Sequence, residues 1–309
     1  MEIEDLVIIG AGPAGMSAAI NAENDGLKFK LLESVSEGWF PKVSVDSHYT
    51  VDNYLGFNEL SGTELISKFK EHLANNRIRF EKADIEKLGK KDDIFTISNK
   101  EKEYFARSII LATGTKQKKL DIPGIEKYLG NSVFYYCAQD GKQFIDKKVL
   151  VIGGRNTGAV TALYLKNLGC DVKIIEKDNQ LNAKHKYKEK IDELKIPYRV
   201  GCNVASLEGE NTLKSVKIQS PEGLEDIVAD GIFVCIGLLP NNSLAKDFGI
   251  ELDNEGYINV NRNMETNILG AYAAGDITGN LKQIIVAAAQ GSIAEYNSHK
   301  FLGEKWKKE

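Results

Sequence analysis

Two glycine-rich segments, each directly after a run of apolar residues, constrain the fold of this chain more than any other feature. Residues 6–9 predict a buried strand, and residues 10–15 read GAGPAG and continue into small residues that favour a helix. In such a strand–turn–helix unit Gly10 makes the tight turn, Gly12 lets the backbone approach a pyrophosphate, and Gly15 lets helix and strand pack closely. The segment therefore predicts a dinucleotide site at a helix N-terminus.

A carboxylate completes this first site. Residues 29–32 predict the next strand, and Glu33 ends it. An acidic residue about 20 positions after the glycine turn can bind the hydroxyls of a ribose. The first half of the chain thus carries every part of the fingerprint.

The second glycine-rich segment departs from the pattern. It follows a strand expected at residues 149–152 and reads GGRNTG over residues 153–158, so that Arg155 occupies the middle glycine position. A side chain there obstructs the close approach of a pyrophosphate. Glu176 ends the following strand, where a 2′-phosphate would need arginines, so NADPH is disfavoured. The residues expected around this second cleft are Gly153, Gly154, Arg155, Asn156, Thr157, Glu176 and Gly237.

Three alternatives remain for the second cleft. It is a scaffold that has lost its ligand, it binds NADH, or it binds a second flavin dinucleotide whose pyrophosphate forms an ion pair with Arg155.

Composition limits the class of protein. A chain of 309 residues with 42% hydrophobic and 27% charged residues predicts a soluble protein of two domains, and a net charge of -4 argues against a nucleic-acid partner. The apolar start is too short for a membrane span and is preceded by acids, so we expect a cytoplasmic protein. The four cysteines and four histidines show no CxxC pair and no metal-ligand spacing, so we expect a reducing compartment and no metal site.

The order of the motifs predicts an α/β protein with two Rossmann-like three-layer nucleotide-binding domains, the second inserted in the first. Residues 1–116 and 243–309 would form the first domain, and residues 117–242 the second. Residues 112–114 (ATG) and 231–241 echo each other at the ends of buried strands. Within the first domain, Ser61 has the position of a helix cap. Residues 80–85 and 94–98 predict a hairpin with its turn at Asp92-Asp93.

Across nearly its whole length the chain resembles the low-molecular-weight thioredoxin reductase family of FAD enzymes. The resemblance rests on six segments: residues 10–15, 53–57 (NYLGF), 112–114, 236–241 (IGLLPN), 273–276 (AAGD) and 282–284 (KQI).

This resemblance implies an FAD cofactor and a homodimer. Asp276 would accept a hydrogen bond from a ribityl hydroxyl, Gln283 and Ile284 would lie at the flavin ring, and Asn53 would contact the flavin from the long loop before the capped helix. The residues expected to bind FAD are Gly10, Gly12, Pro13, Ala14, Gly15, Glu33, Asn53, Ala112, Thr113, Gly114, Gly275, Asp276, Lys282, Gln283 and Ile284.

One functional element of that family is missing. Its members reduce a partner's disulfide through a CxxC placed just before Asp-Gly, and in this chain residues 135–141 read YYCAQDG. Tyr136 and Gln139 stand at the two cysteine positions, and neither side chain can exchange a disulfide. Cys137 lies between them, either as an inert buried cysteine or as a lone redox thiol beside Asp140.

These observations favour an FAD-dependent oxidoreductase whose flavin exchanges electrons directly with a partner. The partner would be a ferredoxin-, flavodoxin- or thioredoxin-like protein, NADH, or a second FAD in the second domain. Tyr136, Gln139 and Asp140 would line the flavin face, with Asp140 a proton donor, and Trp39 or Phe40 could stack near the ring. Two alternatives are a non-catalytic or regulatory flavoprotein that senses redox state, and a thiol–disulfide reductase that uses Cys137 alone.

Overall fold

The chain is divided into two compact units. The computed structural model describes residues 2–34, 50–135 and 137–306. Unit 1 comprises Met1–Lys116 and Leu239–Glu309, and unit 2 comprises Gln117–Leu238. Unit 2 is therefore inserted between the two segments of unit 1, and the chain returns to unit 1 a few residues before the expected position 243. The two passages between the units, β9 (Thr115–Gln117) and β18 (Leu238–Pro240), pair with each other.

Unit 1 is built on a seven-stranded sheet in the order β5-β2-β1-β8-β7-β6, with β19 also paired to β8. The strands β5, β2, β1, β8 and β19 are parallel neighbours, and β6 and β7 continue the sheet as an antiparallel hairpin. The bounds are β1 (Ile3–Ile9), β2 (Phe29–Glu33), β5 (Phe80–Lys82), β6 (Lys87–Lys91), β7 (Ile94–Ser98), β8 (Glu103–Leu111) and β19 (Ala271–Ala273).

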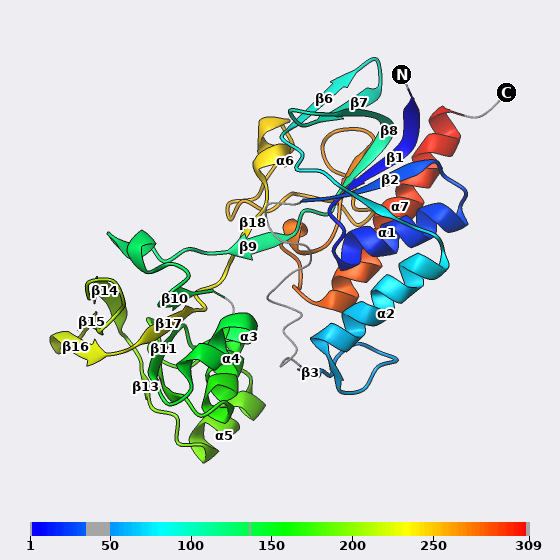
Figure 1. Cartoon of the computed structure of the whole chain (residues 1–309). Helices are drawn as coiled ribbons and strands as arrows, with labels where there is room; N and C mark the ends of the chain where they lie inside the picture. The colour runs from blue at the N-terminus through cyan, green and yellow to red at the C-terminus, as the bar shows by residue number, and fades with distance from the viewer. Residues whose placement is uncertain (1, 35–49, 136, 307–309) are drawn as a thin grey trace. The chain divides into compact units, whose positions relative to one another are not determined.

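Alternate residues of β1 bury opposite faces of this sheet, as the two-residue period of a strand requires. Leu6 and Ile8 pack in the cluster that includes the small residues of the helices, whereas Val7 and Ile9 pack in the cluster that includes β7. Figure 1 shows α1 and α7 together on one side of the sheet. The helices of unit 1 are α1 (Pro13–Asn24), α2 (Gly62–Asn75), α6 (Ser243–Asp247), α7 (Ile284–Lys305) and the 3-10 turn η3 (Asp276–Thr278).

The helices α1 and α7 approach each other closely at Gly291. A Cβ added at Gly291 of α7 would lie 2.0 Å from the backbone oxygen of Ala14 in α1. Only glycine fits this crossing, so the backbones of the two helices are in direct contact.

The start of α2 agrees with the sequence prediction. Ser61 caps the helix: its hydroxyl accepts the Glu64 N–H at 3.2 Å, and the Glu64 carboxylate accepts the Ser61 N–H at 2.8 Å. This reciprocal pair is a capping box. The short strands β3 (Thr50–Val51) and β4 (Leu60–Ser61) pair just before it.

One of the two strands predicted for the hairpin, at residues 80–85, is wrong. Asp92 and Asp93 do form its turn, with φ of 50° and 65°, but they connect β6 to β7. Residues 80–82 instead form β5, which pairs in parallel with β2. An alternating apolar run shows that a strand forms but not which strand it pairs with, and here the partner is distant in the sequence.

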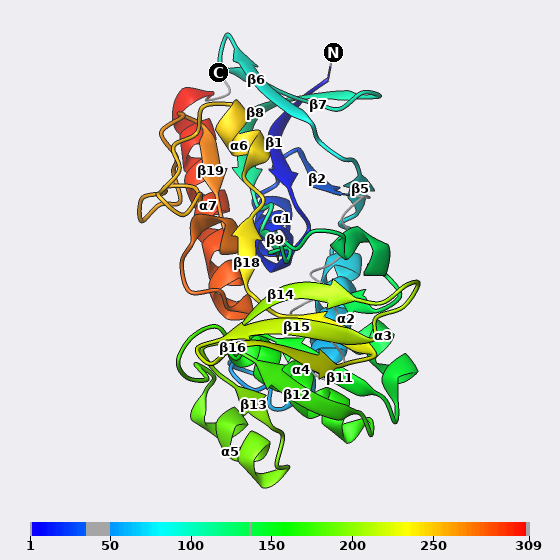
Figure 2. The ribbon, with the colours of Figure 1, turned by 90° about the vertical axis from the view of Figure 1, so that its left-hand side faces the viewer.

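Unit 2 contains a five-stranded parallel sheet in the order β10-β17-β11-β12-β13 and a three-stranded antiparallel sheet, β14-β15-β16. Within this unit, Figure 2 shows the antiparallel sheet over one face of the parallel sheet. Val149 and Val151 of β11 pack in the cluster that contains α4, and Leu150 and Ile152 pack with β15. The bounds are β10 (Val133–Phe134), β11 (Lys148–Ile152), β12 (Asp171–Ile175), β13 (Tyr198–Arg199), β14 (Asn203–Glu208), β15 (Ser215–Ser220), β16 (Gly223–Val228), β17 (Gly231–Val234), α3 (Cys137–Asp140), α4 (Asn156–Asn167), α5 (His185–Glu193), η1 (Ile125–Tyr128) and η2 (Gly141–Phe144).

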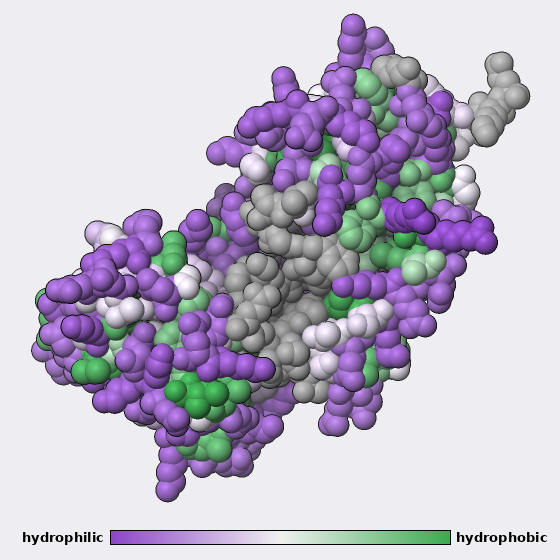
Figure 3. Space-filling model, viewed as in Figure 1, coloured by the Kyte–Doolittle hydropathy of each residue, from purple (hydrophilic) through white to green (hydrophobic). Residues whose placement is uncertain are grey.

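The surface shown in Figure 3 is mostly hydrophilic on both units. Among the described residues, no helix has the length and apolar character needed to cross a membrane.

Candidate functional site

The first glycine turn joins β1 to α1, and two of its glycines are required by the fold itself. Gly10 has φ of +108°, and a Cβ there would lie 2.2 Å from the backbone oxygen of Ala112. A Cβ at Gly15 would lie 1.8 Å from the backbone oxygen of Gly10. Any side chain at either position would separate the strand from the helix or from the neighbouring segment.

The middle glycine has a different environment. No atom of the described residues lies within 4 Å of a Cβ built at Gly12. Gly12 is the N-cap of α1 and provides no side-chain cap, and Pro13 is the first helical residue. The first N–H groups of α1 therefore lack a capping side chain, beside open space at Gly12, an arrangement that suits a phosphate.

Glu33, at the end of β2, is oriented by backbone N–H groups. Its carboxylate accepts hydrogen bonds from the N–H of Ala11 and, at 3.1 Å, from the N–H of Ser34. Burial raises the pKa of Glu33, the two N–H donors lower it, and Asp84 raises it. A carboxylate has about four acceptor positions, so it can still accept the hydroxyls of a ribose.

A second group of predicted residues lies between β19 and α7. Gly275 has φ of +85°, and its N–H donates to Gln290 Oε1 at 2.8 Å. Burial raises the pKa of the neighbouring Asp276, and the charge of Lys282 lowers it. The Nζ atom of Lys282 lies 4.4 Å from the centre of the Tyr257 ring. Sequence reasoning missed Gln290, whose buried amide fixes the backbone of the predicted cofactor loop.

The loop before α2 contacts the start of α7. Asn53 Nδ2 donates a hydrogen bond to Gln283 Oε1, so the structure brings together two predicted flavin-contacting residues that are far apart in the sequence. Gln283 is the N-cap of α7, and Ile284 is its first residue.

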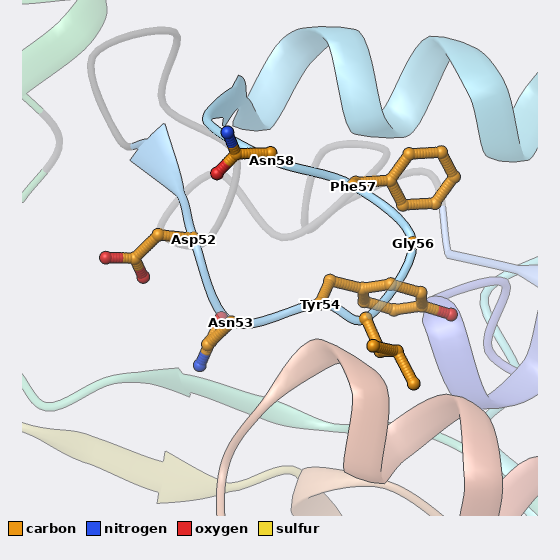
Figure 4. Close-up of a pocket in the computed structure, with 7 residues that line it drawn as sticks. Asp52, Asn53, Tyr54, Gly56, Phe57 and Asn58 are labelled. Atoms are coloured by element: carbon orange, nitrogen blue, oxygen red, sulfur yellow. The ribbon is translucent and has the colours of Figure 1, made fainter.

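The same loop borders an open surface pocket of about 460 Å³ lined by Asp52, Asn53, Tyr54, Leu55, Gly56, Phe57 and Asn58. Figure 4 shows these residues along the curve of the loop. The Tyr54 ring centre is 5.7 Å from that of Phe57 and 5.8 Å from that of Phe69 on α2. These aromatic contacts attach the loop to α2 and leave Leu55, at 90% exposure, in solvent.

Thr113 and Gly114 have partners within the protein. Thr113 Oγ1 donates to the backbone oxygen of Asn241 at 2.8 Å, and Asn241 Nδ2 donates to the backbone oxygen of Thr113 at 3.0 Å. The Asn241 N–H donates to the backbone oxygen of Gly114 at 3.0 Å. These bonds join the two segments of unit 1, a structural role that the sequence did not predict for Asn241.

The second glycine turn, between β11 and α4, repeats the backbone geometry of the first. A Cβ at Gly153, where φ is +116°, would lie 2.3 Å from the Cys235 backbone oxygen, and a Cβ at Gly158 would lie 1.8 Å from the Gly153 backbone oxygen. Glu176 corresponds to Glu33. Its buried carboxylate accepts the N–H of Gly154 and, at 2.8 Å, the N–H of Asp178.

Arg155 distinguishes the two turns. It is the N-cap of α4, in the position that Gly12 has in α1. Its side chain is 72% exposed, and its Nη2 atom lies 3.8 Å from Asp178 Oδ2. The next residue, Asn156, is in the first turn of α4 and accepts the Lys184 N–H at 2.8 Å. The second turn thus has an arginine side chain at the position where the first turn has Gly12 and open space.

None of the four cysteine thiols is accessible to solvent. None of the four is in a disulfide and all are buried, and burial raises the pKa of the Cys235 thiol to about 11. Cys137 Sγ lies 3.8 Å from Thr161 Oγ1, and Cys235 Sγ lies 3.6 Å from the same hydroxyl. Tyr136, Trp39, Phe40 and the side chain of Gln139 lie outside the described residues. Asp140 is half-buried and immediately precedes η2.

The fold and the first site together define a two-domain protein of the dinucleotide-binding class. A model of the pyridine nucleotide-disulphide oxidoreductase family matches residues 4–291, so the chain belongs to that family. It is an FAD-dependent oxidoreductase of the thioredoxin reductase type, and the predicted fold class and family are confirmed.

Several relatives show the same likeness over nearly the full chain. The "34.2 kDa protein in rubredoxin operon" of Clostridium pasteurianum is 34% identical over 97% of this chain and 98% of its own length. Thioredoxin reductase of Bacillus subtilis is 32% identical over 98% and 96%. The crystal structure of Lactococcus lactis thioredoxin reductase superposes with a TM-score of 0.91 at 31% identity, covering 97% of this chain and 99% of that one.

Proposed function

We propose that the flavin of this protein exchanges electrons directly with a partner, without an internal dithiol. The observation that carries this proposal is the thiol inventory. The sequence has Tyr136 and Gln139 where the family's CxxC is expected, and all four cysteines are buried and outside any disulfide. A disulfide relay needs two thiols that can pair and then meet a partner, and no two cysteines here meet that requirement.

The residues of unit 1 fit the cofactor that this function needs. The uncapped start of α1 at Gly12 suits the pyrophosphate, Glu33 suits the adenosine ribose, and Asp276 suits the ribityl hydroxyls. Asn53 and Gln283, already hydrogen-bonded to each other, would hold the ring end. When bound, FAD supplies the electron-transfer chemistry, and these side chains supply position and electrostatics.

The electron donor is proposed to be a small redox protein, with NADH or a second FAD in unit 2 as alternatives. A 2′-phosphate would meet the carboxylates of Glu176 and Asp178. Among the described residues, Arg155 is the only cation that forms an ion pair with either carboxylate. NADPH is therefore disfavoured. The relative named for a rubredoxin operon supports a small redox protein as partner.

The experiment is an anaerobic titration of the purified, flavin-loaded protein. We expect reduced ferredoxin or flavodoxin to bleach the flavin absorbance and to support continued turnover with an artificial electron acceptor, whereas NADPH should not. Slow, stoichiometric reduction without turnover by any of these donors or by NADH would favour the regulatory flavoprotein instead. A protein that gains no flavin on reconstitution would contradict both.

Cys137 provides a separate test of the thiol alternative. Because the Cys137 side chain is buried, its replacement by serine should leave electron transfer unchanged. Loss of turnover in Cys137→Ser, with flavin content and folding intact, would establish the single-thiol reductase and reject direct transfer.

A further inference from the structure

A group of three ligand-type side chains lies away from the cofactor site, where α1 ends against α7. Asp25 is the C-cap of α1, and Glu295 and His299 are four residues apart on α7, which places them on one face of that helix. One ligand atom from each lies within 4.8 Å of the other two. His299 Nδ1 is 2.9 Å from Asp25 Oδ2.

Glu295 makes this group more than a surface ion pair. The residue is 1% exposed, and its Oε1 atom has no hydrogen-bond partner among the described residues. A buried carboxylate without full partners is costly, and a second carboxylate close by increases the cost. Within the described part of the chain, the Oε1 atom of Glu295 is thus buried beside Asp25 and His299 without a donor of its own.

We propose that Asp25, Glu295 and His299 bind a divalent transition-metal ion that joins the end of α1 to α7. Two carboxylates and one imidazole are a donor set that suits Zn²⁺ and its neighbours, whereas Mg²⁺ and Ca²⁺ prefer oxygen donors alone. Three protein ligands leave the fourth position of a tetrahedral site to water.

The geometry needs only small side-chain adjustments. Ligand atoms bound to one Zn²⁺ at about 2.0–2.2 Å lie roughly 3.4 Å apart in a tetrahedron. That spacing is between the 2.9 Å from His299 Nδ1 to Asp25 Oδ2 and the 4.8 Å within which all three ligand atoms lie. The exposed Asp25 and the partly exposed His299 can move inward to meet Glu295. The α7 backbone is fixed nearby, because Ser298 Oγ donates to Ser108 Oγ at 2.8 Å and Tyr272 donates to the Asn297 backbone oxygen at 3.0 Å.

The ion would be structural. The start of α1 is at the glycine turn, and the start of α7 is at Gln283, so both helices begin at the proposed cofactor site and meet again at the three ligands. Joining the end of α1 to the middle of α7 would stabilise unit 1 without contact with the reacting atoms.

The test is Zn²⁺ titration of the tag-free, flavin-loaded protein by calorimetry, with thermal unfolding measured in parallel and Mg²⁺ as the comparison ion. We expect one Zn²⁺ per chain and a higher unfolding temperature with Zn²⁺ alone. Glu295→Gln, His299→Gln and Asp25→Asn should each weaken binding about 100-fold or more, since even the loss of an outer-shell partner costs about 10–100-fold.

The matched control is His185→Gln. His185 and Glu189 on α5 form another histidine–carboxylate pair four residues apart, at 3.4 Å, but both are exposed and no third ligand was found with them among the described residues. This variant should bind Zn²⁺ like the parent. No saturable binding by the parent, or unchanged binding in Asp25→Asn, whose exposed side chain can be altered without disturbing the core, would overturn the proposal.

Discussion

The two glycine turns share a backbone and differ at one side chain, and this difference separates two kinds of glycine. The first and last glycines are in equivalent contacts: Gly10 and Gly153 abut a neighbouring carbonyl oxygen, and Gly15 and Gly158 each abut the first glycine of their own turn. In both units, a glutamate at the end of the following strand accepts the N–H of the second residue of the turn.

The middle position alone differs, with Gly12 in the first turn and Arg155 in the second. Nothing in the described protein occupies the space at Gly12, so the fold does not require glycine there. In this chain the contacts of the fold therefore account for the outer glycines of both turns, whereas the middle glycine of the first turn would be accounted for by the proposed pyrophosphate. Unit 2 has the same framework with a long side chain at that middle position.

The largest expected effect is common to both turns. Gly15→Ala and Gly158→Ala place a Cβ about 1.8 Å from a backbone oxygen, so each should destabilise its unit by about 4 kcal/mol or more. Soluble yield and thermal unfolding measure this. Gly303→Ala in α7 is the control, because no atom lies within 4 Å of its added Cβ and a gain of up to about 1 kcal/mol is expected. If Gly158→Ala were harmless while Gly15→Ala was not, the equivalence of the two frameworks would fail.

The next effect is specific to the first turn. Gly12→Arg, which copies the second turn, should weaken FAD binding about 100-fold or more, equivalent to about 3 kcal/mol. The fold should be retained because the position is open. The ratio of flavin to protein absorbance after dialysis measures the loss, and Gly12→Ala should lose less flavin. Full retention of flavin by Gly12→Arg would refute the assignment of the pyrophosphate to this helix start.

The reverse change tests the second turn. Arg155→Gly removes the guanidinium and its ion pair with Asp178, and the rate of flavin reduction by NADH should rise about tenfold if the side chain only obstructs the cleft. Arg262→Gly, on the surface of unit 1, should change nothing. A loss of a bound second flavin in Arg155→Gly would instead show that Arg155 binds a pyrophosphate.

The smallest effect concerns the residue whose backbone oxygen lies against the first glycine of each turn. This residue is Ala112 in unit 1 and Cys235 in unit 2. Because alanine serves in the equivalent place, Cys235→Ala should cost no more than about 1 kcal/mol. Because its pKa is raised, the Cys235 thiol holds its proton more strongly in the folded protein than in the unfolded chain. Its contribution to the free energy of unfolding is therefore complete below pH 9 and is lost as pH rises toward 11. Urea unfolding at several pH values measures it. A thiol that reacts with an alkylating reagent at neutral pH in the native protein would contradict this burial.

Local signals in the sequence were sufficient for the parts of the fold that depend on neighbouring residues. The glycine turns, the glutamates after them and the Ser61 cap each follow from spacing within one strand–turn–helix or helix start. Strand pairing was not predictable in the same way: residues 80–82 pair with β2 through contacts between segments distant in the sequence.

The candidate site shows the same limit. The resemblance identified Asn53 and Gln283 separately, but only the folded chain shows that they bond to each other. Gln290 and Asn241 act through hydrogen bonds to the backbone of other segments, and no sequence spacing marks such a role. Asp25 is 274 residues before His299, so no local spacing in the sequence indicates that these two residues and Glu295 lie together.

The crossing of α7 over α1 at Gly291 has a mechanical consequence. Where the Ala14 carbonyl lies against Gly291, no side chain separates the two backbones that could absorb a displacement of either helix. A shift of α7, whether from a bound partner or from a substitution on its outer surface, would therefore be passed to the first turn of α1 at this crossing. Affinity for the prosthetic group should accordingly respond to changes made far from it along this helix.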